Sequence, residues 1–141
     1  MKNWPFSFSA LIEAVSRGGR DARARLDELI RHQPQVLLPY AKELAALLDS
    51  TRAPVRKASI ETLAALSRIS PSAMAFLLPK LHALLASEPQ SVVVNHAIEI
   101  LVNYGKTSAR AAKKVIPILR GLGGKHRAAA KALDEITPSS L

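Results

Sequence analysis

VRKASIETLAAL, residues 55–66, is the stretch of this chain that decides its fold. A small residue, Ser59, is followed four residues later by Leu63 and three residues after that by Leu66. Side chains at spacings of four and three lie on one stripe of an α-helix, so the stretch predicts a helix with one buried face. Pro54 directly precedes the stretch, where a helix loses nothing through a missing backbone N–H.

The same pattern recurs in three more windows of twelve residues, 18–29, 93–104 and 125–136. In every window the fifth residue is small, the ninth is leucine and the twelfth is large and apolar, and the leucines are 37, 38 and 32 residues apart. Repeats of this length predict supersecondary units that stack on one another. The three positions are occupied, in chain order, by Ala22, Ser59, Ala97 and Ala129, by Leu26, Leu63, Leu101 and Leu133, and by Leu29, Leu66, Tyr104 and Ile136.

Helix-period segments also fill the chain between these windows, over residues 6–16, 36–48, 73–85 and 108–119. Ser70 and Pro71 are typical of a helix start, and glycines fall between segments, at 18–19, 105 and 121–124. No useful length of the chain alternates with period two, as a strand would. We therefore predict eight helices in four pairs, forming a single domain over residues 1–137, with a short disordered tail at 138–141.

Composition excludes several classes of protein. Hydrophobic residues make up 48% of the 141 residues and aromatics only 4%, which favours closely packed helices over a β-sandwich. The absence of cysteine excludes a disulfide scaffold, a thiolate zinc site and a cysteine nucleophile. Neither a signal-peptide run nor a membrane-spanning apolar stretch is present, so we predict a cytoplasmic protein with no membrane association. The net charge of +9 suggests an acidic partner, nucleic acid included.

The stretch VRKASIETLAAL resembles the second helix of a HEAT repeat, and LLPYAKELAALLD before it resembles the first helix, with Pro39 at the kink and Asp49 near the turn. The resemblance covers the whole chain in period and apolar stripe, and armadillo and other HEAT-like families share these features. Only the second unit carries the full motif, since Val94 and His126 stand where Arg56 does. The resemblance implies an all-α, right-handed α-α superhelix of about four helix pairs with the second helices on its concave face. Terminal units would cap the stack, with Trp4, Phe6 and Phe8 closing one end.

The third residue of each window would then line one edge of the concave face. Three of the four residues in this row are basic. Lys57 and Glu61 are four residues apart, so we expect them to form an ion pair within their helix that neutralises the centre of the groove. A solvated helix face is the alternative interpretation of such a row. The predicted partner-binding residues on the concave face are Arg20, Arg56, Lys57, Asn95 and Arg127.

A stronger charge signal lies near the C-terminus, where no acidic residue occurs between Glu99 and Asp134 although eight lysines and arginines do. Such a surface could follow a phosphate backbone or meet an acidic protein. No Phe, Tyr or Trp lies in the stretch that holds these eight residues, 106–131, so single-stranded bases would have no aromatic side chain to stack on there. The predicted basic patch consists of Arg110, Lys113, Lys114, Lys125 and Lys131.

Catalytic, cofactor-binding and metal-binding residues are not predicted. The four histidines fall in different segments, and the spacing of His96 and Glu99 is that of a surface hydrogen bond. The run GLGGKH at 121–126 lacks the first glycine and the Ser or Thr of a phosphate-binding loop, so a turn between helices is the better interpretation.

We therefore predict a non-catalytic binding or scaffold module that recognises an acidic protein partner through its concave face and its basic C-terminal helix pair. The alternative is a nucleic-acid-binding solenoid that uses the basic surface on the phosphate backbone. A hydrolytic or base-excising enzyme ranks third, because Glu61 and Glu99 have no aromatic residues close in sequence. The apolar ends of a four-unit stack would also allow dimerisation.

Overall fold

The computed structural model describes residues 10–12, 14, 17, 19–122 and 126–136, and every regular element among them is helical. The chain divides into two compact units, Met1–Ile69 and Ser70–Leu141. The division falls at the helix start predicted from Ser70 and Pro71, and it leaves two of the predicted helix pairs in each unit. The single domain expected over residues 1–137 stays a prediction, and each unit is described by itself below.

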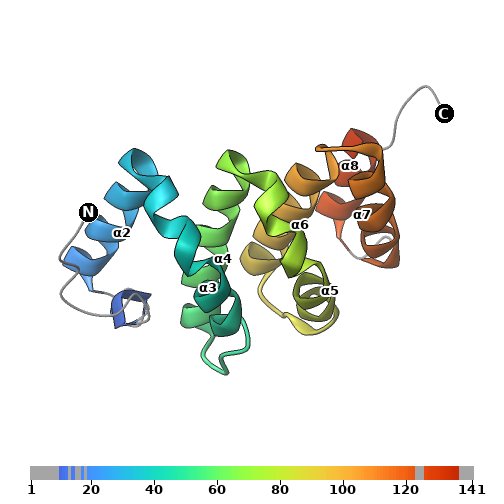
Figure 1. Cartoon of the computed structure of the whole chain (residues 1–141). Helices are drawn as coiled ribbons and strands as arrows, with labels where there is room; N and C mark the ends of the chain where they lie inside the picture. The colour runs from blue at the N-terminus through green and yellow to red at the C-terminus, as the bar shows by residue number, and fades with distance from the viewer. Residues whose placement is uncertain (1–9, 13, 15–16, 18, 123–125, 137–141) are drawn as a thin grey trace. The chain divides into compact units, whose positions relative to one another are not determined.

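The N-terminal unit is built around α4 (Ala53–Ile69), which packs against α2 (Arg20–His32), η1 (Pro34–Tyr40) and α3 (Ala41–Leu47) (Figure 1). Helix α4 has a wide buried face because small and aliphatic side chains fill most of its positions. In the first predicted segment, residues 10–12 and 14 are helical, whereas the expected capping by Trp4, Phe6 and Phe8 lies outside the described residues. The core of this unit includes Leu11, Ile12, Leu26, Leu37, Leu44, Ile60, Leu63 and Leu66.

The C-terminal unit is built around α6 (Ser91–Gly105). This helix packs against η2 (Pro71–Leu77), α5 (Leu78–Ser87), α7 (Ala109–Leu122) and α8 (Arg127–Ile136), and α7 also packs against α5 and α8 (Figure 1). Helix α6 is the most enclosed element of the unit because it has neighbours on several sides. The core here includes Met74, Leu77, Leu81, Val93, Ala97, Leu101, Val115, Leu119 and Ala129. The tail expected at 138–141 lies outside the described residues.

The repeat positions predicted the core with two exceptions. Three of the four ninth-position leucines and all four twelfth-position residues are buried, as are Ser59, Ala97 and Ala129 at the fifth position. Leu133 and Ala22 are only half-buried. They belong to the last and the first of the four windows, and Leu133 lies on α8, whose main neighbours are α6 and α7. A residue on such a helix keeps part of its side chain in water.

The first helices of the two middle pairs change winding along their length. Residues 36–48 and 73–85 were expected to be helical, and each of these helices begins with a seven-residue 3₁₀ segment, η1 or η2, that leads into α3 or α5. A proline lies at both changes, with Pro39 inside η1 and Pro79 in the first turn of α5, although α7 stays α-helical around Pro117. A proline ring has no N–H to donate and would clash with the carbonyl four residues earlier in an α-helix. In these two helices the chain takes the tighter 3₁₀ winding on the N-terminal side of the α-helical segment.

Ser59 gives a first stability prediction. Its side chain is 0% exposed, and its Oγ has no hydrogen-bond partner among the described residues. The other three windows have alanine at the equivalent position. We expect Ser59→Ala to raise the free energy of unfolding by about 1 kcal/mol, because a buried hydroxyl without a partner is destabilising. Urea denaturation measures the change.

Thr62 supplies the control for this prediction. It is equally buried on α4, but its Oγ1 donates a hydrogen bond to the Ala58 carbonyl at 3.0 Å. Thr62→Val removes a satisfied hydroxyl at nearly constant volume and should give no gain in stability. A Ser59→Ala protein no more stable than the parent would show that the Ser59 hydroxyl finds a partner in solution.

Candidate functional site

The most distinctive surface in the described residues is one side of α7. Ala111, Ala112, Val115 and Leu119 recur at helical spacing and are buried, which leaves the opposite side of the helix in solvent. No acidic residue occurs in α7. The solvent side carries four exposed basic residues, called the cation face below: Arg110, Lys113, Lys114 and Arg120.

The cation face has no counter-charge within the described part of the chain, where none of its four side chains forms an ion pair or hydrogen bond. Other basic residues of the unit do form ion pairs; for example, Lys106 Nζ lies 3.3 Å from Glu135 Oε1. Like charges three or four residues apart destabilise a helix by roughly 0.2–0.5 kcal/mol per pair. The fold therefore gains nothing from Arg110, Lys113 and Lys114, and these cations remain available to a ligand.

The basic patch predicted from the sequence separates into two surfaces. Arg110, Lys113 and Lys114 lie together on the cation face, and Lys125 lies outside the described residues. Lys131 is exposed on α8, where Asp134 and Glu135 are exposed beside it, so that surface has mixed sign. Arg120 was not among the predicted site residues. Its seven-residue spacing from Lys113 is about two helical turns and places it on the same side of α7, so helical periodicity in the sequence could have identified it.

The residues predicted for the concave row are mostly exposed. Arg20 and Lys57 are exposed in the N-terminal unit, and Asn95 and Arg127 are exposed in the C-terminal unit. Arg56 is half-buried, and its Nη1 donates a hydrogen bond to the Ser50 carbonyl at 2.9 Å. Part of the Arg56 donor capacity thus stabilises the turn between α3 and α4.

The local pair expected between Lys57 and Glu61 is not the one that forms. Glu61 Oε1 instead lies 3.0 Å from Arg23 Nη1 on α2, while Arg23 Nε lies 3.1 Å from Asp27 Oδ1. The hydrogen bond with Glu61 is the largest influence on Arg23 and raises its pKa above the ordinary value, against an opposing effect of partial burial. The planar guanidinium of Arg23 contacts both carboxylates at once through different nitrogens, whereas a lysine ammonium has a single nitrogen.

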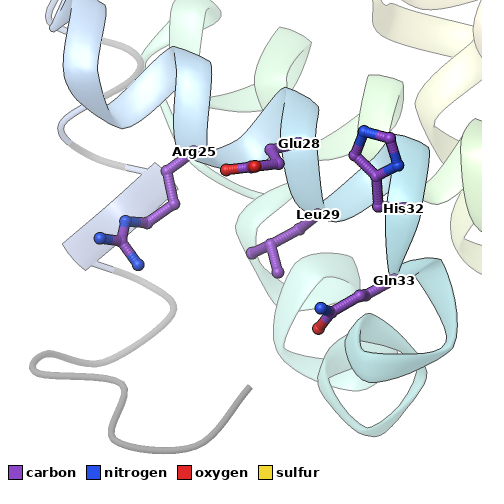
Figure 2. A pocket seen from close by; sticks show the side chains of 5 residues that line it. All are labelled: Arg25, Glu28, Leu29, His32 and Gln33. Carbon is purple, nitrogen blue, oxygen red and sulfur yellow. The ribbon is translucent and has the colours of Figure 1, made fainter.

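A shallow pocket of about 260 Å³ lies along α2 in the N-terminal unit. Its lining consists of Arg25, Glu28, Leu29, His32 and Gln33, all from α2 and the residue that ends it. Figure 2 shows the side chains of Arg25 and His32 extending to opposite sides of this pocket. Because all the lining residues come from one helix and its end, no second element encloses a ligand there, as a specific small-molecule site requires.

The described residues contain neither a cluster of metal ligands nor a helix that could span a membrane. His96 Nδ1 lies 3.5 Å from Glu99 Oε1, the surface contact predicted from their spacing, but no group of three or more potential ligands gathers among the described residues. None of the described helices combines the length and apolar character needed to cross a bilayer. Comparison of the chain with protein-family models, with curated proteins and with solved structures gives no match.

Proposed function

We propose that this chain is a non-catalytic binding module that holds an acidic protein surface on the cation face of α7. The observation that carries the proposal is the combination of exposed, unpaired cations with a helix free of acidic residues. Complementary charge accelerates encounter between proteins and suppresses wrong partners. A surface whose cations have no internal partners can form ion pairs across an interface without first breaking ion pairs of its own.

An acidic protein suits this surface better than nucleic acid does. The cation face extends along about 15 Å of helix, at 1.5 Å per residue, whereas duplex binding commonly uses about six to ten phosphate contacts. Asp134 and Glu135 on α8 would repel a phosphate backbone that continued past α7 onto that helix. Neither α7 nor α8 has an aromatic residue on which a single-stranded base could stack.

The proposal includes HEAT-like stacking of the helix pairs in a right-handed superhelix. Its support is the packing of helices that follow one another along the chain and the burial of Leu26, Leu63 and Leu101. In that arrangement α2, α4, α6 and α8 line the concave side, and Arg20, Lys57, Asn95 and Arg127 form a second contact row. Small-angle X-ray scattering tests the superhelix, since a curved stack and two collapsed units give different distance distributions.

Fluorescence anisotropy tests the binding function with two labelled probes, a glutamate-rich peptide and a short DNA duplex, each at low and physiological salt. We expect the peptide to bind, and Lys113→Glu/Lys114→Glu to weaken its affinity about tenfold or more, because two attractions become repulsions. The matched control is Arg31→Glu/Lys42→Glu, which makes the same change in net charge at two exposed residues of α2 and α3 and leaves α7 intact. This control should retain most of the affinity.

Other outcomes would overturn the proposal. Duplex DNA that binds more tightly than the peptide, with a steep salt dependence that Lys113→Glu/Lys114→Glu removes, would establish the nucleic-acid function instead. Equal losses in the two double variants would show that net charge, and not the cation face, attracts the peptide. No binding of either probe at low salt would leave the cation face without a function in binding.

A further inference from the structure

An uncharged surface lies on η2 and α5. Every exposed residue from Pro71 to Ser87 is uncharged when histidine is counted as neutral, and the charged residue of this stretch, Lys80, is half-buried and takes part in an interaction. Phe76 is the most apolar of them and is 40% exposed. Residues three and four apart follow Phe76 along the helix, and together they make up what we call the apolar face: Phe76, Pro79, Ala83 and Ala86.

The apolar face is not needed for the chain's own core. The opposite side of η2 and α5 supplies Met74, Leu77, Leu81, Leu84 and Leu85, which are already buried in the C-terminal unit. The exposed sides of helices in soluble domains usually carry charged residues of both signs. An exposed aromatic residue within an uncharged helix surface is instead typical of a contact that another molecule covers, since aromatic residues are enriched in interface cores.

The apolar face and the cation face lie on neighbouring helices. Helix α7 packs against α5, and both helices pack against α6 (Figure 1). Both helices turn their buried stripes towards the core of the unit and their other sides towards solvent, and η2, which carries Phe76, packs against α5 and α6. Phe76 and the exposed residues of α5 thus belong to the helix next to the one that carries Arg110, Lys113 and Lys114.

We infer that the two faces form one docking surface for an amphipathic acidic helix of a protein partner. The inference rests on the proposed function and specifies the partner. An aliphatic stripe on the incoming helix would cover Phe76 and Pro79, and aspartate or glutamate on one flank would meet the cation face. A phosphate backbone fits this surface less well, because it has no apolar group with which to bury Phe76.

Two synthetic peptides of identical composition, made only of leucine, alanine and glutamate, test the inference by anisotropy. In one peptide the leucines form a single helical stripe, and in the other the same residues are ordered so that no face is apolar. We expect the striped peptide to bind about tenfold more tightly, and Phe76→Ser to remove most of that advantage, since burial of part of one aromatic side chain has an effect of this size. Lys113→Glu/Lys114→Glu should weaken both peptides.

Two further variants keep the test decisive. Val92→Ser is the matched control, because Val92 is 44% exposed on α6 and lies outside the apolar face, and it should leave both affinities unchanged. If Phe76→Ser unfolds the protein, which circular dichroism would detect, Ala83→Glu tests the apolar face instead. Ala83 is an exposed helical position, so the added carboxylate should repel the acidic striped peptide while the fold stays intact.

The outcomes separate this inference from the proposed function. Equal affinity for the two peptides, with both weakened by Lys113→Glu/Lys114→Glu, would overturn the apolar docking and leave the cation face as the binding site. No binding of either peptide would overturn both statements. Loss of the striped peptide's advantage in Val92→Ser as well as in Phe76→Ser would show that the apolar contact lies elsewhere on the unit.

Discussion

Replacing Leu101 by alanine is expected to lower the free energy of unfolding by about 3 kcal/mol, within the range of about 2–5 kcal/mol that buried leucine truncations cost. Leu101 is 0% exposed and lies on α6, the helix around which the C-terminal unit packs. The truncation removes transfer free energy and leaves a cavity that several neighbouring helices would have to move to fill. Urea denaturation with an unchanged m-value measures the loss.

Leu133→Ala provides the matched control. The two leucines occupy the same repeat position, but Leu133 is only half-buried on α8. Truncation there removes less buried area and leaves a groove that water can enter, so we expect a loss of about 1 kcal/mol. Equal losses at the two positions would contradict the difference in burial that the structure shows.

Replacing Ala97 by leucine is the second large effect, with an expected loss of about 1–3 kcal/mol. Ala97 is 0% exposed at the fifth repeat position, where every window has a small residue. Added methylene groups at such a site force neighbouring side chains off their rotamers or push the helices apart. Thermal unfolding followed by circular dichroism measures the change.

The control for this prediction is Ala130→Leu. Ala130 is exposed on α8, and leucine is nearly as good a helix former as alanine, so stability should change by less than about 0.5 kcal/mol. An Ala97→Leu protein as stable as the parent would show that α6 and its neighbours have room at the fifth position. The small-residue rule derived from the repeat would then have no basis in packing.

Much of the fold could be predicted from the sequence because helical periodicity is a local property. The stretch 55–66 predicted a helix that the structure extends to Ala53–Ile69, and the ninth-position leucines predicted core residues on three of four helices. The 3₁₀ segments were missed because apolar spacing hardly distinguishes a 3₁₀ turn from an α-helical one. Pro39 and Pro79 were visible in the sequence, but proline alone does not say which winding the chain takes around it.

The candidate site was only partly predictable. The lack of acidic residues around Lys113 and Lys114 was plain in the sequence, yet the predicted patch also included Lys131, which has acidic neighbours on α8. The local pair of Lys57 with Glu61 was wrong because spacing along one helix can assess only partners within that helix. Arg23 is 38 residues from Glu61 and reaches it because α2 packs against α4.

The sequence by itself determined that this chain is helical, where its second helices lie and which small and large positions repeat. These properties follow from the 3.6-residue period and from backbone preferences that act over a few residues. Tertiary structure alone decided that Phe76 stays exposed while Met74 and Leu77 are buried, and that the helix of the apolar face packs against the helix of the cation face. Burial depends on which other helix covers a side chain, and that neighbour is distant in sequence.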